Sequence, residues 1–200
     1  MKLLEGKAMT MIYFVRHAEP VHSWKEDRSR PLTEEGVIDS KAVADYFRDI
    51  KVDLFYSSPY KRSLDTISDS AKEKKLPVRT DERFRERVNG NEVNNKEMFL
   101  KRWTDFDYHE ENGESLSMVQ NRNMEALTEI LQNHEGKTIV IGTHGTALST
   151  ILNFYEPDFN INSFLRIIDY MPYIIRLDFD GESFIRKEEL LILLKEYKRD

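Results

Sequence analysis

The sequence predicts an α/β fold, a three-layer sandwich in which helices flank a mostly parallel central sheet. Two features carry this prediction. Short continuous apolar runs, typical of strands that are buried on both faces, recur along the chain. Segments with apolar residues at helical spacing lie between these runs, so that strands and helices alternate.

The first part of the chain supplies three expected strands and two expected helices. The apolar run "MIYFV" at 11–15 is the first strand. The threonine of "PLTEEG" suits an N-cap, with glutamates in the first turn, and predicts a helix over 33–50. "VDLFYSS" at 52–58 is the second strand, and the proline after it suits the first position of a helix over 59–74. "LPVRT" at 76–80 is a short third strand.

The rest of the chain continues the alternation after a polar insertion. Gly136 suits a helix end, and the Asp-Gly pair at 180–181 suits a hairpin turn. The expected elements are, in order, an irregular polar segment over 81–112 with a short helical piece at 96–106, a long helix over 113–136, a strand over 137–142, a helix that ends near residue 155, a hairpin over 173–185 and a terminal helix over 188–198.

Length and composition favour one globular domain. A chain of 200 residues with 40% hydrophobic content can bury a real core, and we place the domain at 11–200. Residues 1–10 are expected to form a disordered extension, because charged residues and a glycine interrupt any apolar leader there.

Several kinds of partner and site are disfavoured. The net charge of −6 argues against a broad basic face for nucleic acid. The chain has no cysteine, which excludes disulfides, thiolate metal sites and cysteine nucleophiles. No run approaches the roughly 18 apolar residues that a membrane span needs. We therefore expect a cytoplasmic protein with no nucleic-acid or membrane partner; a homodimer is a further expectation.

Polar residues with catalytic potential follow three of the expected strands. The first strand runs into Arg16 and His17, the second into a Ser-Ser pair with Arg62 one turn into the next helix, and the fourth into Thr143, His144 and Gly145. Ligands of such sheets bind outside the carboxyl ends of the strands, so one crevice should collect two arginines and two histidines.

This set of side chains suits a phosphate dianion. Arginine forks match phosphate oxygens in a bidentate manner. A neutral imidazole can attack phosphorus if its other nitrogen is held by an acceptor. Gly145 would let the backbone come close to a ligand. The reaction also needs an acid at the pocket edge to protonate the leaving oxygen.

At this point the sequence resembles a known family. "RHAE", "PLTEEG", "SSPYKRSLDT", "RER", "NGES" and "GTHG" occur in the order found in the histidine phosphatase (phosphoglycerate mutase-like) superfamily. The resemblance spans about residues 11–155 and favours a phosphatase-type member. It implies a sheet flanked by helices, no metal or other cofactor, and a cap inserted after the third strand, which here is the segment at 81–112.

The resemblance also implies residue roles. His17 is similar to the nucleophile that becomes a phosphohistidine, and Arg16 and Arg62 are similar to the phosphate clamps. His144 is similar to the second pocket histidine, which hydrogen-bonds the transferring phosphoryl group. Glu86 is similar to the acid that protonates the leaving oxygen and then activates water.

The sequence departs from the family pattern at three places. Ala18 stands where a glycine usually follows the nucleophile, and its methyl group narrows the room beside the phosphate. Ser23 stands where mutase-type members have an asparagine, and it is expected to donate one hydrogen bond to the phosphate. "NGNEVNNKE" replaces a tryptophan-containing stretch after the acid, which affects lid shape and specificity.

Several alternatives stay open at this level. The first interpretation is a phosphomonoesterase of small phosphorylated metabolites, since a short cap poor in aliphatic residues should admit water. The others are a phosphoglycerate mutase or related phosphotransferase, a non-catalytic phospho-ligand-binding protein, and a metallohydrolase built from His17, His22, His144 and Glu86.

Individual residues also have alternatives. Glu86 lies in a charged run in which solvation is a rival explanation, and Glu82 and Glu92 are the other candidate acids. His22 and His109 are expected at the surface or in the cap. The arginines at 28–30 are either a solvated loop or a recruiting site for anionic substrates.

Overall fold

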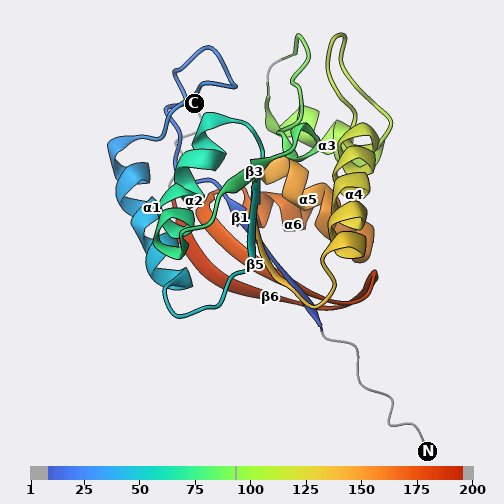
Figure 1. Cartoon of the computed structure of the whole chain (residues 1–200). Coiled ribbons are helices and arrows are strands. Elements are labelled where there is room, and N and C mark those ends of the chain that lie inside the picture. Colours follow the sequence, from blue (N-terminus) through green and yellow to red (C-terminus); the bar gives the residue numbers. More distant parts are fainter. Residues whose placement is uncertain (1–8, 93, 196–200) are drawn as a thin grey trace, which may run out of the picture.

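The computed structural model describes residues 9–92 and 94–195, and its centre is one six-stranded sheet (Figure 1). The spatial order of the strands is β3-β2-β4-β1-β5-β6. The strands are β1 Thr10–Arg16, β2 Leu54–Ser57, β3 Val78–Thr80, β4 Thr138–Thr143, β5 Tyr170–Asp180 and β6 Ser183–Leu194.

Helices cover both faces of the sheet, which confirms the predicted α/β sandwich. The described helices are α1 Glu34–Phe47, α2 Lys61–Lys74, α3 Lys96–Thr104, α4 Leu116–Asn133, α5 Gly145–Tyr155 and α6 Ile161–Ile167, with a 3₁₀ turn, η1, at Glu82–Phe84. None of these helices combines the length and the low polarity that a membrane span needs.

Alternating side chains of the central strands build two apolar clusters. On one face, Tyr13 and Val15 of β1 pack with Phe47 of α1 and Ile67 of α2. On the other face, Phe14 and its same-side neighbours pack against α4, α5 and α6. Strand β1 is therefore buried on both faces, as its continuous apolar run predicts.

The parallel part of the sheet sets the position of the polar residues. Strands β1 and β2 both pair in parallel with β4, and β3 pairs in parallel with β2. Among the described strands, β5 and β6 change this pattern, because β5 runs antiparallel to β1 and β6 antiparallel to β5. The carboxyl ends of β1, β2 and β4 thus share one edge of the sheet.

Helix α1 starts as predicted. The Thr33 hydroxyl accepts a hydrogen bond from the Gly36 N–H at 2.9 Å, which is the expected N-cap contact. Gly36 lies against the backbone of the loop after β1, where an added Cβ would come within 2.3 Å of the Glu19 carbonyl oxygen. The glycine of "PLTEEG" thus lets α1 touch the loop that follows Arg16 and His17.

The predicted helix over 188–198 is wrong. Residues through Leu194 belong to β6, which pairs with β5 along nearly its whole length, and 196–198 lie outside the described residues. Glu, Leu and Lys favour helices locally, but pairing with a long neighbouring strand overrides this propensity. Cross-strand ion pairs such as Arg176–Glu188 at 2.9 Å add to the pairing.

Smaller differences concern element ends. Helix α2 begins at Lys61, so the proline two residues earlier precedes the helix. The hairpin is confirmed, but its strands are longer than predicted and its turn is Gly181-Glu182, with Gly181 at a φ of 58°. Helix α6 has no counterpart in the predicted elements. Thr10, assigned to the extension, is buried in β1, while 1–8 lie outside the described residues.

The insertion at 81–112 lies above the carboxyl edge of the parallel strands (Figure 1). It contains η1 and α3, so it is less irregular than predicted. Its centre is Glu110, which is 3% exposed and accepts hydrogen bonds from Arg87 at 3.0 Å and from Arg102 at 2.7 Å. Through this buried carboxylate, the end of the insertion is joined both to its beginning at Arg87 and to helix α3 at Arg102.

Candidate active site

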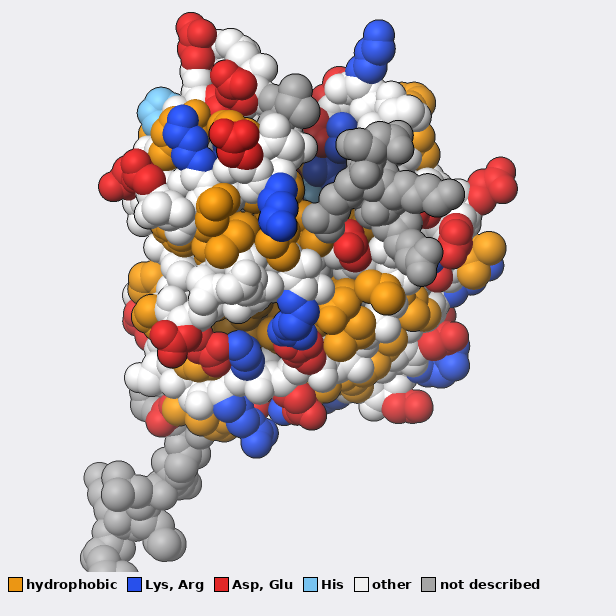
Figure 2. Space-filling view, turned by 180° about the vertical axis from the view of Figure 1, so that it is seen from behind, with side chains coloured by type: hydrophobic (Ala, Val, Ile, Leu, Met, Phe, Trp, Pro, Cys, Tyr) orange, Lys and Arg blue, Asp and Glu red, His pale blue; other side chains and the backbone are white. Residues whose placement is uncertain are grey.

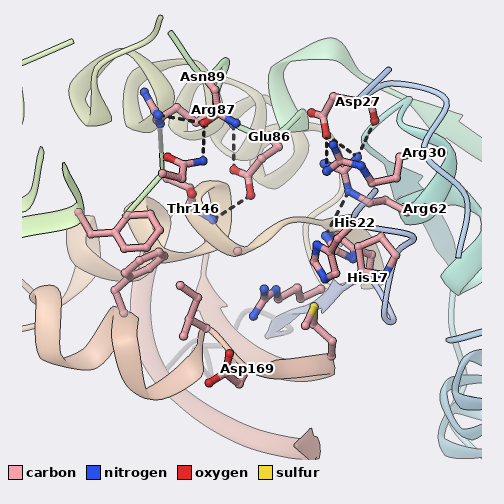
Figure 3. Close-up of a pocket in the computed structure, with 18 of the residues that line it drawn as sticks. His17, His22, Asp27, Arg30, Arg62, Glu86, Arg87, Asn89, Thr146 and Asp169 are labelled. Atoms are coloured by element: carbon pink, nitrogen blue, oxygen red, sulfur yellow. Dashed lines mark hydrogen bonds and ion pairs between the residues drawn. The ribbon is translucent and has the colours of Figure 1, made fainter. Parts of the chain in front are cut away.

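A cavity of about 570 Å³ opens at the carboxyl edge of the parallel strands. Figure 2 shows it as a hollow with basic side chains inside, and Figure 3 shows the residues that line it. In the close-up, His17 and Arg62 lie on one side, and Glu86 and Asn89 lie on the other. A crevice thus lies at the expected edge of the sheet, between the loop after β1 and the insertion. Arg16, His17 and Arg62 line it, whereas His144 is not among its lining residues.

The hydrogen bonds of His17 define its tautomer. Its Nδ1 lies 2.7 Å from the Ala18 carbonyl oxygen, which can only accept, so Nδ1 carries the proton. Its Nε2 accepts a hydrogen bond from the Arg62 Nε–H at 3.2 Å, so the in-plane electron pair of the ring is on this atom. Burial, followed by the charges of Arg62 and Arg16, lowers the pKa of His17 well below 6.5. The imidazole is therefore neutral at pH 7.

Arg16 ends β1 and points into the same site. Its Nη1 donates to the carbonyl oxygens of Ile167 at 2.7 Å and Tyr170 at 3.2 Å, while its buried Nε has no partner in the described chain. Burial lowers the pKa of Arg16 to about 10, which leaves it charged at neutral pH. A Cβ on Gly145 would lie 3.2 Å from the guanidinium carbon. Glycine at this position lets α5 begin directly against Arg16.

Arg62, in the first turn of α2, is held by the loop after β1. Its Nη1 donates to the Asp27 carbonyl oxygen at 2.6 Å and lies 3.1 Å from the Asp27 carboxylate. The same carboxylate pairs with Arg30 at 2.9 Å, and both Asp27 and Arg30 line the cavity. Sequence reasoning did not select Asp27. Nothing in the local pattern marks it, because the loop brings it to Arg62 from 35 residues away.

His144 lies beneath the cavity and is fully buried. Its ring centroid is 5.2 Å from that of His17, and its Nε2 is 2.7 Å from the Ser58 hydroxyl. Burial, followed by the charge of Arg62, lowers the pKa of His144 well below 6.5, so this ring is also neutral. Its Nδ1 has no hydrogen-bond partner among the described residues.

Glu86 lines the cavity at the N-terminus of α5. Its carboxylate accepts hydrogen bonds from the N–H groups of Arg87 at 2.8 Å, Thr146 at 3.1 Å and Ala147 at 3.2 Å. These donors hold the carboxyl group in one orientation in the same cavity as His17. Among the candidate acids, Glu82 instead pairs with Arg28 at the surface, and Glu92 is exposed and does not line the cavity.

Other predicted residues are placed differently. Ser23 is exposed and is not among the residues that line the cavity. His22, expected at the surface, is exposed but also lines the cavity, whereas His109 does not. Ala18 is buried, and its N–H donates to the Thr66 hydroxyl at 2.9 Å. In the part of the chain that the structure describes, no group of three or more histidine, aspartate or glutamate side chains could hold a metal ion.

The sheet and the site define an α/β enzyme of the phosphoglycerate mutase-like architecture. The sequence profile of the histidine phosphatase superfamily (branch 1) matches residues 12–187, and the chain belongs to this family. The resemblance drawn from the sequence motifs is thereby confirmed, and the protein is an enzyme of the phosphatase class.

Curated relatives carry phosphatase names. Phosphoserine phosphatase 1 of Hydrogenobacter thermophilus is 32% identical over 151 residues, which cover 68% of this chain and 71% of the relative. A Bacillus subtilis protein named "Uncharacterized phosphatase PhoE" is 28% identical over 149 residues, which cover 72% and 76%.

Solved structures share the fold. YhfR of Bacillus stearothermophilus superposes with a TM-score of 0.72 at 26% identity, and the match covers 88% of this chain and 94% of that one. A mycobacterial glucosyl-3-phosphoglycerate phosphatase superposes with a TM-score of 0.75 at 19% identity, covering 90% and 97%. At that identity the second match shows the fold alone.

Proposed function

We propose that the chain is a phosphomonoesterase of small phosphorylated metabolites that works through a phosphohistidine on His17. The observation that carries this proposal is the tautomer of His17. The Ala18 carbonyl accepts a hydrogen bond from Nδ1, and the Arg62 guanidinium donates one to Nε2. The ring is therefore neutral, and its in-plane electron pair on Nε2 lies in a cationic pocket. A nucleophile that attacks a phosphate dianion needs this state.

The first step transfers the phosphoryl group. His17 Nε2 forms a bond to phosphorus while the ester P–O bond breaks, and the leaving oxygen takes the proton of a protonated Glu86. Arg16 and Arg62 balance the charge on the phosphoryl oxygens. Neither Arg16 Nε nor His144 Nδ1 has a hydrogen-bond partner among the described residues, and a phosphate oxygen would supply one to each N–H group.

The second step returns the enzyme to its resting state. The Glu86 carboxylate takes a proton from water, the water oxygen bonds to phosphorus, and the N–P bond breaks to release inorganic phosphate. His17 is again neutral and Glu86 again protonated, so the cycle closes without a metal or other cofactor.

Trapping tests the covalent step. Wild-type protein mixed with ³²P-labelled phosphoserine and quenched in alkaline detergent should retain label that mild acid removes and base does not. Phosphoserine is the first probe because one curated relative bears that name. His17→Ala should retain no label and no turnover, while His109→Ala, outside the cavity, should behave as wild type. Base-labile label, or fast turnover by His17→Ala, would refute the mechanism.

A product assay separates hydrolysis from isomerisation. With 3-phosphoglycerate and a trace of the bisphosphate, inorganic phosphate should appear faster than the 2-phospho isomer. The opposite order would make the protein a mutase.

A further inference from the structure

Glu86 lies on a stretch of chain without regular secondary structure. The 3₁₀ turn η1 ends at Phe84 and α3 begins at Lys96, and the described residues between them form no helix or strand. Such backbone has no ladder of hydrogen bonds to fix it. A general acid must nevertheless hold its carboxyl group within reach of one leaving oxygen. Contacts from outside this stretch must therefore keep Glu86 in place.

An arginine of the neighbouring helix α4 binds the backbone at Glu86. The Arg122 Nη1 donates to the carbonyl oxygens of Arg83 at 2.7 Å and Arg85 at 2.8 Å. Its Nη2 donates to the carbonyl oxygen of Glu86 itself at 3.1 Å. One planar guanidinium thus holds three carbonyl groups that lie before and at the candidate acid. Arg122 is not among the residues that line the cavity, so it reaches Glu86 from behind.

Glu114 pairs with Arg122 and binds the chain on both sides of Glu86. Its two carboxylate oxygens accept hydrogen bonds from Arg122 Nε at 3.0 Å and Nη2 at 2.9 Å, which makes a bidentate ion pair. The same carboxylate accepts from the side chain of Arg85 at 2.6 Å and from the Val88 N–H at 2.9 Å. The ion pair therefore fixes the backbone before and after the acid.

This ion pair is buried, and its hydrogen bonds are complete. Only 12% of the Arg122 side chain and 14% of the Glu114 side chain are exposed. Arg122 makes five hydrogen bonds, as many as a guanidinium has N–H groups. Burial raises the pKa of Glu114, but the hydrogen bonds from Arg122 and the Val88 N–H outweigh burial and lower it below its ordinary value. A buried ion pair adds little stability compared with apolar packing, so a gain in stability does not explain it.

Helix α5 holds the other end of Glu86. The carboxylate accepts hydrogen bonds from the N–H groups of Thr146 and Ala147 in the first turn of that helix, and Figure 3 shows the contact with Thr146. Arg122 thus fixes the backbone of Glu86 while α5 fixes its carboxylate. A shift of the backbone would draw the carboxylate away from both the helix and the cavity.

We propose that Arg122, paired with Glu114, is a positioning residue for the acid Glu86. The inference rests on the proposed phosphatase function and concerns the step in which Glu86 protonates the leaving oxygen. Because Arg122 reaches the reaction only through Glu86, its loss should slow the esters that need an acid. Its loss should also weaken the contact between Glu86 and α5.

Leaving-group dependence tests the first effect. In Arg122→Gln, single-turnover cleavage of phosphoserine should fall at least about tenfold, and cleavage of p-nitrophenyl phosphate less than about twofold. In a Glu86→Gln background, Arg122→Gln should cause no further fall, because the acid that it positions is already absent. Arg122→Lys should recover little, since an ammonium group cannot replace the planar fork. Equal falls for both esters, or a further fall in the double variant, would assign Arg122 a structural role only.

Arg83→Gln is the matched control. Arg83 also joins this stretch to α4, through ion pairs with Glu125 at 3.1 Å and Glu129 at 2.8 Å. Its side chain does not line the cavity and binds carboxylates, whereas Arg122 binds the backbone at Glu86. Arg83→Gln should therefore cleave both esters as wild type does. The same selective fall in this control would show that any loosening from α4 suffices, and it would refute the special role of Arg122.

Amide exchange distinguishes this inference from the proposed function. In Arg122→Gln, hydrogen–deuterium exchange followed by NMR should be about tenfold faster at the Thr146 and Ala147 N–H groups, whose acceptor is Glu86. The Leu148 N–H bonds to a backbone carbonyl at 3.0 Å and should exchange as in wild type. If wild type cleaves no phosphate ester, the phosphatase proposal fails, and this measurement still decides the positioning role. Unchanged exchange at both groups, or faster exchange throughout α5, would refute that role.

Discussion

Two neighbours from different parts of the chain fix the tautomer of His17. Ala18 supplies a carbonyl from the next residue, and Arg62 supplies a donor from another helix. In turn, the loop residue Asp27 holds Arg62. A chain of three contacts therefore orients the His17 imidazole, and each contact joins a polar atom to a complementary one.

Glu86 should matter most for esters with poor leaving groups. An alkyl leaving oxygen needs a proton as the P–O bond breaks, whereas p-nitrophenolate is stable without one. In Glu86→Gln, single-turnover cleavage of phosphoserine should fall at least about a hundredfold, within the usual range for loss of a general acid. Cleavage of p-nitrophenyl phosphate should fall less than about tenfold.

Glu82→Gln serves as the control, because Glu82 pairs with Arg28 at the surface and lies outside the cavity. It should leave both rates near wild type. Single-turnover conditions isolate the first step, since Glu86 is also proposed to activate water in the second. Equal falls for both esters in Glu86→Gln would remove Glu86 as the acid.

Among the structural elements, helix α1 shows how one glycine connects the scaffold to the site. Its first turn lies against the carbonyl of Glu19, two residues after His17. The Thr33 hydroxyl also contacts the Glu19 carboxylate at 2.9 Å. The helix thus supports the loop that carries Asp27.

Gly36→Ala should destabilise the fold. An added Cβ would lie 2.3 Å from the Glu19 carbonyl oxygen, so helix and loop must move apart. Overpacking of this kind costs roughly 1–3 kcal/mol. Urea unfolding followed by circular dichroism should show this loss. Val37→Ala, at the next and 50% exposed position, should change stability by less than about 0.5 kcal/mol. Wild-type stability in Gly36→Ala would show that the loop yields without cost.

Strand β6 shows the limit of local propensity. "EELLILL" has the composition of a helix, yet these residues pair with β5 as part of β6. A pairing between segments is a property of the assembled sheet, and single-segment reasoning cannot detect it. The buried strands β1 and β4 were predictable because their continuous apolar runs need no knowledge of a partner.

At the scale of the whole molecule, the same contrast separates the two halves of the site. The end of the site at β1, β2 and β4 was predictable, since Arg16, His17, Arg62 and His144 follow strands whose carboxyl ends must meet. The opposite end was not predictable. Asp27 and Asn89 reach the cavity on two long loops and Lys96 at the first position of α3, and no periodic pattern encodes the paths of those loops.

The two site histidines should also make the whole molecule sensitive to mild acid. Burial lowers the pKa of both His17 and His144 well below 6.5 in the folded state, while the unfolded chain takes up protons near 6.5. Below that pH the unfolded state binds more protons than the folded state, so stability is full above about pH 6.5 and falls as the pH drops. Each histidine can contribute a slope of about 1.4 kcal/mol per pH unit. The carboxylates with lowered pKa, such as Glu110, affect stability only at lower pH.

The free energy of unfolding in urea should therefore decrease between pH 7.5 and 5.5. The decrease should be smaller in His17→Gln and His144→Gln, whatever their stability at pH 7.5. His109→Gln, at an exposed position, should keep the wild-type decrease. A wild-type decrease that neither site variant reduces would show that other groups cause the acid sensitivity.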